Sequence, residues 1–414
     1  MNWWESDFAT VKRDKLWLGG RKAADLAAEH GTPAYVYGKE AVLARYAYLE
    51  GLLAAAAPVE AWLCYAMKAN PHPGLLALLR KRGARIDAVS PSEVDAALAA
   101  GFPPERILFT GTSVSLADLE RVFAIEGLTV NIDAAEQLEV MGRFKRRSWP
   151  KRMIRVSVRW NPGLGSGFNP RVITAGRRSS DGTPIKFGVE ERKVLGVFER
   201  ARALDFRPIG LHQHLGSGWI RGDFPTVREA ADKMIRKARE LKEKGFGLEF
   251  LDFGGGFGPR YAKGQGRFPV ERYLGHIVRS VAAAGLGLKA LAFEPGKFLV
   301  GDAGALLLRV EYVKESYGNL FACVNGGTYN TVPRPAIYLQ AFHEIVNASR
   351  VDGGPKARLT VAGNLCETGD VFGKERLMPV PKTGEILAVL GAGAYCRSMA
   401  SNFNLREIPK EILV

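Results

Sequence analysis

Short apolar runs alternate with longer amphipathic stretches from about residue 34 to residue 294. Short apolar runs bounded by Gly or Pro are typical of buried strands, and apolar positions every three or four residues are typical of helices. The predicted strands are 34–37, 61–67, 85–89, 106–110, 128–132, 155–159, 207–212, 248–252 and 289–293. The alternation gives roughly eight strand–helix units, which predicts a (β/α)8 TIM-type barrel, with an open doubly wound sheet as the alternative.

The pattern changes after about residue 297, where helical periodicity becomes scarce. Strand-like segments follow one another at 303–313, 320–325, 357–362 and 385–390. This succession predicts a mostly β C-terminal domain. We therefore predict three parts: an N-terminal segment, 1–30, that pairs with the β domain; a barrel, 31–296; and a β domain, 297–414, that completes the active site.

Composition narrows the class of protein. The chain has 414 residues, of which 47% are hydrophobic, enough for a large core. Its four cysteines show no CxxC pair, so we expect neither a zinc site nor a disulfide scaffold, and we predict no metal. The start lacks the pattern of a signal peptide, and no apolar run is long enough to span a bilayer. We therefore expect a cytoplasmic protein without a membrane partner.

The net charge of +15 favours anionic partners such as acidic metabolites or an acidic carrier protein. The basic residues are spread along the chain in small clusters, for example at 145–147 and 177–178. No zinc finger, RNA-recognition signature or basic stripe interleaved with aromatic residues is present in the sequence. Nucleic acid is therefore not an expected partner.

Unusual polar residues stand at the C-terminal ends of four predicted barrel strands. They are Lys68 and the segments 212–218 (HQHLGSG), 252–258 (DFGGGFG) and 294–297 (EPGK). Ligands of (β/α)8 barrels bind at this end of the strands. These residues are therefore the candidate active site.

Lys68 closes an apolar run, where desolvation lowers the pKa of an ammonium group and leaves a nucleophilic amine suited to Schiff-base chemistry. Taken alone, a lysine that simply reaches solvent is the more common explanation of this position. Gly254, Gly255 and Gly256 allow backbone N–H groups to approach a phosphate, and Ser217 offers a hydroxyl to it, although glycine runs also form plain turns.

Two further strand-end residues fit a pyridine ring. Glu294 can hold a protonated pyridine nitrogen, which makes the ring an electron sink. His214 can pack on a flat ring, but it can equally be a metal ligand or a purely structural histidine. A lysine, a phosphate cradle and a carboxylate on separate strand ends together predict a pyridoxal 5′-phosphate site.

The C-terminal domain carries three more candidates. Cys366 lies next to Glu367 and can deliver a proton to a carbanion, unless it is a small core residue. Arg334 can clamp a carboxylate with two hydrogen bonds. Tyr395 presents a phenol after a Gly-rich run.

Seven segments in fixed order carry a resemblance to a known family: YAMKAN, HLGSG, DFGGGFG, EPGK, RPAIY, NLCETGD and GAYCRSMASNFN. With them, the chain resembles the diaminopimelate decarboxylases, within the alanine-racemase-like (fold type III) pyridoxal phosphate enzymes. The resemblance runs from residue 31 to the C-terminus. It implies a (β/α)8 barrel followed by a β domain, a decarboxylase (carboxy-lyase) activity in lysine biosynthesis, and a small amino-acid substrate.

The resemblance also implies a role for each site residue. The cofactor would be held by Lys68, His214, Ser217, Gly254, Gly255, Gly256, Glu294 and Tyr395. The substrate would be bound by Lys297, Arg334, Tyr338, Glu367 and Tyr395, and the catalytic residues would be Lys68 and Cys366. In this family the Cys366 and Glu367 positions enter the partner subunit's site, so a homodimer is implied.

Two departures from the family pattern bear on the substrate. Lys297 stands where the family has arginine, which exchanges a two-pronged donor for a point charge. Cys396 and Arg397 stand where the family commonly has Gly-Phe. The expected reaction is meso-diaminopimelate to L-lysine and CO2. The alternative is a larger or carrier-bound amino acid of siderophore or antibiotic biosynthesis, whereas a cofactor carrier without turnover and a racemase are disfavoured by the CETGD segment.

Overall fold

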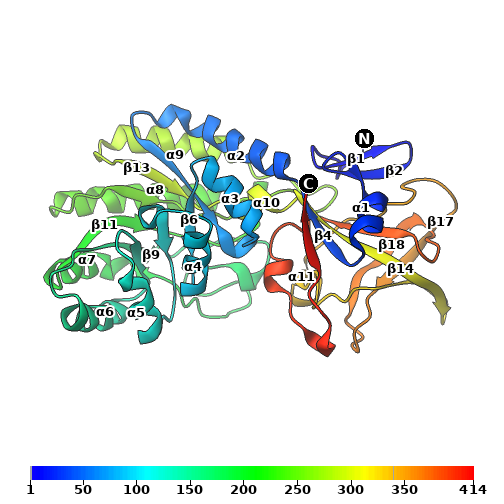
Figure 1. The fold of residues 1–414 in the computed structure, drawn as a ribbon. Helices are drawn as coiled ribbons and strands as arrows, with labels where there is room; N and C mark the ends of the chain where they lie inside the picture. The colour runs from blue at the N-terminus through cyan, green and yellow to red at the C-terminus, as the bar shows by residue number, and fades with distance from the viewer. Residues whose placement is uncertain (1, 339) are drawn as a thin grey trace. The chain divides into compact units, whose positions relative to one another are not determined.

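The computed structural model describes residues 2–338 and 340–414. The chain forms two compact units (Figure 1). The barrel unit comprises Ala47–Gly258 and Gly266–Gly296. The β unit comprises Met1–Tyr46, Pro259–Gln265 and Lys297–Val414. Each unit therefore contains segments that are far apart in the sequence.

Among the residues that the structure describes, eight parallel strands of the barrel unit close into a barrel. In order they are β5 (Glu60–Ala66), β6 (Arg85–Ala88), β7 (Ile107–Phe109), β8 (Thr129–Ile132), β9 (Ile154–Asn161), β11 (Phe206–His212), β12 (Phe250–Asp252) and β13 (Ala290–Phe293). The ring closes because β13 pairs in parallel with β5, with Ala290 opposite Glu60. A short strand, β10 (Val189–Glu190), adds to β9. The predicted TIM-type barrel is confirmed, and the open-sheet alternative is wrong.

The predicted start of the barrel at residue 31 is wrong. The apolar run at 34–37 does form a strand, β4 (Ala34–Tyr37), but it pairs with β14 (Gly304–Ser316) and β20 (Lys410–Leu413) of the β unit. The reason is that all four residues are buried, and an apolar run carries no information about which sheet it joins. The barrel itself begins at β5.

Helices lie outside the barrel strands in Figure 1, among them α3 (Pro73–Lys81), α4 (Pro91–Ala99), α5 (Leu116–Ala124), α6 (Ala135–Ser148), α7 (Val194–Ala203), α8 (Phe224–Glu243) and α9 (Val270–Ala284). Their boundaries follow local chemistry. The hydroxyl of Ser90 accepts a hydrogen bond from the N–H of Glu93 and caps α4. Helix α9 ends at Gly285, whose φ of 56° lies in the left-handed region that favours glycine.

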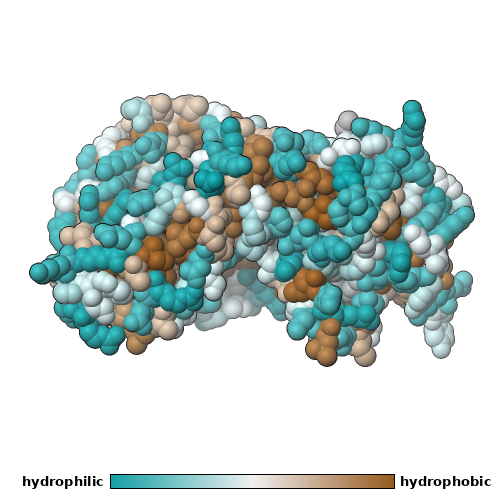
Figure 2. All heavy atoms as spheres, viewed as in Figure 1, coloured by the Kyte–Doolittle hydropathy of each residue, from teal (hydrophilic) through white to brown (hydrophobic). Residues whose placement is uncertain are grey.

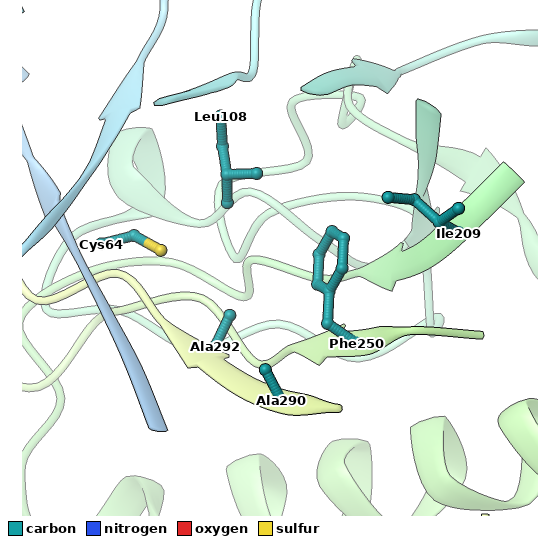
Figure 3. Packing of buried hydrophobic residues seen from close by; sticks show 6 residues of the cluster. All are labelled: Cys64, Leu108, Ile209, Phe250, Ala290 and Ala292. Atoms are coloured by element: carbon teal, nitrogen blue, oxygen red, sulfur yellow. The ribbon is translucent and has the colours of Figure 1, made fainter. Parts of the chain in front are cut away.

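Figure 3 shows the apolar layer inside the barrel, where Cys64, Leu108, Ile209, Phe250, Ala290 and Ala292 pack together from five different strands. Gly210 is required here, because a Cβ at this position would lie 2.4 Å from the Phe250 ring. Trp62 packs on the same ring with a centroid separation of 5.3 Å. The layer fills the barrel below the strand ends, so a ligand can enter only from the C-terminal side.

The β unit contains an eight-stranded, mostly antiparallel sheet. Its remaining strands are β15 (Asn319–Val324), β16 (Ile345–Asn347), β17 (Lys356–Ala362), β18 (Val371–Pro379) and β19 (Ile386–Leu390). The long strand β14 pairs with β4, β15 and β19 and thereby holds the sheet together. Two short helices, α10 (Lys297–Val300) and α11 (Arg334–Ile337), belong to this unit, as do α1 (Ala23–His30) and the start of α2 (Lys39–Leu53).

The N-terminal segment forms its own antiparallel sheet of β1 (Ala9–Lys12), β2 (Lys15–Leu18) and β3 (Arg21–Lys22). It contacts the C-terminal part of the β unit through backbone hydrogen bonds, from Leu16 N–H to Ala348 O and from Val351 N–H to Asp14 O. Hydrophilic residues cover much of the face drawn in Figure 2, and hydrophobic ones appear there as separate patches. In the described part of the chain, no helix is both long enough and apolar enough to cross a bilayer.

Candidate active site

A cavity of about 300 Å³ lies at the C-terminal end of the barrel strands. It is lined by Lys68, Asp87, Val89, Thr110, Thr112, Arg159, Thr174, Phe187, His212, His214 and Glu294. Three of these, Lys68, His214 and Glu294, are residues that the sequence predicted for the site. The barrel therefore brings them together from strands that are far apart in the sequence.

Lys68 follows β5, and its Nζ contacts Oδ2 of Asp87 on the neighbouring strand β6. Asp87 has no exposed surface, whereas the Lys68 side chain is 30% exposed. Burial and the negative charge of Glu294 raise the pKa of Asp87 against the attraction of Lys68. The amine is thus held from inside the barrel and directed at the cavity.

Glu294 comes directly after β13 and is 3% exposed. Burial raises the pKa of this carboxyl, but the attraction of His212 and of Lys68 outweighs it, and the pKa falls to about 2. Nε2 of His212 lies 3.1 Å from Oε1 of Glu294. A carboxylate that stays ionised in a buried pocket suits a protonated ring nitrogen.

His214 contacts Thr174, which lies on the long loop between β9 and β10. The Thr174 hydroxyl is 2.9 Å from the backbone oxygen of His214 and 2.9 Å from its Nδ1. A carbonyl oxygen can only accept, so the hydroxyl donates to it and accepts from Nδ1–H. Burial lowers the pKa of His214 to about 3, which keeps the ring neutral and able to lie flat against an aromatic ligand.

Gly254, Gly255 and Gly256 pack directly against neighbouring strand ends. A Cβ would lie 2.4 Å from Gln213 O at Gly254, 2.2 Å from Glu294 O at Gly255 and 2.3 Å from the Trp219 ring at Gly256. Only glycine therefore fits at these positions. The oxygen of Gly256 accepts the N–H groups of Gly218 and Trp219, which joins this loop to the Ser217 loop.

Backbone amides of the loop that contains Gly255 and Gly256 are free to bind an anion. Among residues 2–338 and 340–414, the N–H groups of Gly255 and Gly256 donate to no protein acceptor, and Ser217 offers its hydroxyl beside them. Free amides in a cradle of glycines bind phosphate. With the amine of Lys68 and the ionised Glu294, the barrel residues fit pyridoxal 5′-phosphate.

The β unit contains a second group of predicted residues. Lys297, at the start of α10, is 5% exposed, and its Nζ lies 5.4 Å from the ring centroid of Tyr395. Arg334 is 2% exposed, lies 4.5 Å from the ring centroid of Tyr261, and its Nη1 is 3.2 Å from Nε2 of His343. Burial and the positive charge of Arg334 lower the pKa of Lys297 well below its usual value.

Cys366 and Glu367 lie on an exposed loop of the β unit. Asp370 shapes this loop, because its carboxylate accepts hydrogen bonds from the N–H of Leu365 (2.7 Å) and from the N–H and hydroxyl of Thr328. Oε1 of Glu367 accepts the hydroxyl of Tyr329 at 3.2 Å. Cys366 is therefore not the small core residue that was the alternative in the sequence.

Tyr338 and Arg397 complete the predicted set in this unit. Tyr338 is half-buried, and its N–H donates to Arg334 O. Arg397, the cation that departs from the family pattern, has its Nε 3.7 Å from Oε2 of Glu411. Its charge is therefore balanced by a carboxylate of β20.

Comparison with known proteins identifies the family. Residues 49–301 match the family described as "Pyridoxal-dependent decarboxylase, pyridoxal binding domain". The diaminopimelate decarboxylase of Methanothermobacter thermautotrophicus is 37% identical over 413 residues, which cover 99% of this chain and 92% of that protein. The chain belongs to the pyridoxal-dependent decarboxylases. The diaminopimelate decarboxylase of Pseudomonas aeruginosa is 33% identical over 411 residues, covering 99% of this chain and 94% of that protein.

Solved structures of decarboxylases share the fold. Diaminopimelate decarboxylase of M. jannaschii in complex with L-lysine has a TM-score of 0.88 at 28% identity, with 99% of this chain and 93% of that chain covered. The Helicobacter pylori enzyme complexed with L-lysine has a TM-score of 0.85 at 29% identity, with 94% and 93% covered. The family resemblance read from the sequence is confirmed, as is the prediction of a pyridoxal-dependent carboxy-lyase.

Several polar residues of the decarboxylase pocket were not assigned a role from the sequence. Arg159, at the end of β9, has Nε 3.8 Å from Oδ1 of Asp133 and its guanidinium 4.5 Å from the Phe187 ring centroid. Asp133 also accepts the hydroxyl of Thr112. The sequence did contain a signal for these pocket residues, because charged side chains such as Asp87 and Arg159 are rare within buried parallel strands.

Proposed function

We propose that this decarboxylase converts meso-diaminopimelate to L-lysine and CO2. The observation that carries the proposal is the convergence of Lys68, Glu294 and the free amides of Gly255 and Gly256 on one end of the barrel. The chain's similarity to diaminopimelate decarboxylases over nearly its full length supports the choice of substrate. L-lysine, the expected product, is bound in two of the similar structures.

Pyridoxal 5′-phosphate, when bound, supplies an aldehyde that bonds to amines and an electron-withdrawing ring that stabilises the negative charge left by departing CO2. Lys68 would hold the cofactor through its side-chain amine, which lines the cavity. The hydroxyl of Ser217 and the backbone N–H groups of Gly255 and Gly256 would hold the phosphate, and Gly254 would shape the loop that presents them. The ionised Glu294 holds the proton on the ring nitrogen. The neutral ring of His214 packs on the cofactor face.

Residues of the β unit take the remaining roles in the proposal. Cys366 delivers the thiol proton to the carbon that lost CO2. Arg334 and Tyr338 bind the substrate, and Glu367 binds its distal end. Tyr395 contacts cofactor and substrate, and Lys297 supplies a positive charge for the substrate where relatives carry arginine.

We further propose that the enzyme is a homodimer with shared active sites. Cys366 and Glu367 are both exposed on the β unit, which supports a role in the site of a partner subunit. The cytoplasmic location stays a prediction from the sequence. An acidic carrier protein also stays a prediction, and the similarity to diaminopimelate decarboxylases does not favour it.

The decisive experiment measures lysine and CO2 released from meso-diaminopimelate by the purified protein with added pyridoxal 5′-phosphate. The LL stereoisomer is the substrate control, and the Lys68→Ala variant is the enzyme control. We expect stoichiometric lysine and CO2 from the meso isomer and none with Lys68→Ala. A protein that binds the cofactor at Lys68 but releases no CO2 would reject this substrate and favour the larger or carrier-bound amino acid.

A further inference from the structure

Three side chains from neighbouring strands meet inside the barrel. His212 ends β11 and lies opposite Asp252, which ends β12. Asp252 lies opposite Ala292 of β13, two residues before Glu294. Side chains alternate along a strand, so His212, Asp252 and Glu294 all project to the side of the apolar layer that contains Ala292. All three are buried.

The three side chains differ in their relation to the cavity. His212 and Glu294 line it, whereas Asp252 is not among its lining residues. One polar atom from each residue lies within 4.8 Å of the other two. Oδ1 of Asp252 accepts the N–H of Gly254 at 2.9 Å. Among the described residues, Oδ2 of Asp252 has no hydrogen-bond partner, so this oxygen can carry a proton for the cluster.

The charges around this cluster distinguish its two carboxyl groups. The pKa of Glu294 is about 2. Burial raises this pKa, but the attraction of His212, Lys68 and His214 lowers it by more. The pKa of Asp252 lies well above its usual value, because burial and the negative charges of Glu294 and Asp87 raise it. The charge of Lys68 and the hydrogen bond from the Gly254 N–H lower it by less. Burial and the surrounding charges therefore shift the pKa values of the two carboxyl groups of the cluster in opposite directions.

We propose that His212 is a positioning residue for Glu294: its ring nitrogen Nε2 lies against one carboxylate oxygen and leaves the other oxygen to the cofactor's ring nitrogen. The Nε2–Oε1 separation is 3.1 Å, an ion-pair contact without hydrogen-bond geometry among the described residues. Without His212, the buried Glu294 loses the ring nitrogen that lies 3.1 Å from its carboxylate and holds a proton on the cofactor's ring nitrogen less strongly. The inference rests on the proposed function only in placing the cofactor ring at Glu294.

The test is the titration of the ring nitrogen in the holoenzyme, followed by the ¹⁵N chemical shift of ¹⁵N-labelled pyridoxal 5′-phosphate. In His212→Leu we expect the nitrogen to lose its proton at a pH lower by at least about one unit than in the wild type. Asp252→Asn keeps the shape of the side chain and leaves the contact between His212 and Glu294 in place, and we expect an unchanged titration. The kcat of His212→Leu should fall while KM changes little.

A matched control removes another histidine–carboxylate contact of the same unit. His276 on α9 has Nε2 2.6 Å from Oδ1 of Asp232 on α8, away from the cavity-lining residues. We expect His276→Leu to leave the nitrogen titration unchanged. If His212→Leu does not fold, His212→Gln tests the same point, because its amide N–H can still face the Glu294 carboxylate and should keep the titration within about half a unit.

Three results would overturn the inference. They are an unchanged titration in His212→Leu, a shift of a full unit in His212→Gln, and a shift in Asp252→Asn as large as that expected for His212→Leu. Zn²⁺ binding to the apoenzyme that is lost in Asp252→Asn would likewise overturn it, because the cluster would then be a metal site. Failure of the wild type to decarboxylate meso-diaminopimelate rejects only the proposed substrate, since the titration requires cofactor binding alone.

Discussion

The side-chain amine of Lys68 contacts the carboxylate of Asp87, a residue with no exposed surface. Ala66, two residues before the lysine, lies opposite Asp87 in the parallel pairing of β5 with β6. The pair thus fixes a nucleophile at the barrel mouth through a carboxylate that solvent does not reach. A charge-assisted contact of this kind restricts where the amine can move.

We expect Asp87→Asn to lower kcat by about 10- to 100-fold, because the amine of Lys68 loses the group that orients it. The unfolding free energy should fall by roughly 1–3 kcal/mol, less than for a fully buried pair because Lys68 reaches solvent. Steady-state kinetics and urea unfolding measure the two effects. The control is Asp95→Asn, which removes an exposed ion pair with Arg121 and should change neither.

Gly255→Ala should reduce the affinity for pyridoxal 5′-phosphate by more than about tenfold. The new Cβ would lie 2.2 Å from Glu294 O, so the loop that offers the free amide of Gly255 must shift. Equilibrium dialysis with the cofactor measures the affinity. Gly196→Ala on α7, where a Cβ meets nothing within 4 Å, is the matched control and should bind normally. Equal affinity of the two variants would remove Gly255 from the phosphate site.

The barrel could be predicted from the sequence because its strands and helices alternate in hydrophobic period, which is a local property. The sheet that β4 joins could not be predicted from the sequence. Its ladder partners, Gly304–Leu307 on β14 and the segment Lys410–Leu413, lie about 270 and 370 residues away, and the apolar run at 34–37 fits any buried sheet. Pairing between distant segments depends on the assembled fold and leaves no periodic signal.

The residues of the active site likewise divide into those that could be predicted from the sequence and those that could not. Lys68, Glu294 and the three glycines could be predicted because rare residue types stand at strand ends, where a barrel binds its ligands. Asp87, Thr174 and Asp252 could not be assigned roles from the sequence. Their importance comes from contacts with Lys68, His214 and the Glu294 cluster, and those contacts exist only after the strands have closed into a barrel.

Thr174→Val should lower kcat and weaken cofactor binding, whereas Thr174→Ser should retain both. Valine keeps the shape of threonine but removes the hydroxyl that contacts Nδ1 and the backbone oxygen of His214. Histidine ¹⁵N shifts of the apoenzyme provide a second readout, because His214 should then lose its fixed Nδ1–H form. A fixed tautomer that persists in Thr174→Val would contradict the assignment.

The stability of the protein should decrease as the pH falls from about 6.5 toward 5. Burial and the charge of Arg334 lower the pKa of His343 to about 3, so the folded state leaves this ring neutral while the unfolded chain protonates it below about 6.5. Unfolding therefore takes up a proton in this window, and each such histidine contributes a slope of about 1.4 kcal/mol per pH unit.

His343→Gln should remove the contribution of one histidine to the dependence of the unfolding free energy on pH. The remaining slope includes His214, whose pKa burial likewise lowers to about 3. Urea unfolding at several pH values between 5 and 6.5 measures the difference, with the half-buried His276 replaced by Gln as the control. An identical slope in wild type and His343→Gln would show that the ring is protonated in the folded protein.

Shared active sites predict that two inactive variants restore activity when they are mixed. Lys68→Ala removes the amine that bonds to the cofactor, and Cys366→Ala removes the proposed proton donor on the exposed loop of the β unit. If each site takes Lys68 from one subunit and Cys366 from the other, a mixed dimer contains one intact site. Equal mixing after subunit exchange should then recover about a quarter of wild-type activity, since half of the dimers are mixed.

A double variant, Lys68→Ala with Cys366→Ala, is the control for this complementation. Mixed with the wild type, it forms dimers whose two sites each lack one residue, so activity should fall below that of the wild-type subunits alone. Mixed with either single variant, it should restore nothing. If the two single variants also restore nothing although sedimentation shows mixed dimers, then Cys366 acts within its own subunit or has no part in protonation. Measuring product from each single variant separates these two cases, because Cys366→Ala alone would retain full activity only in the second.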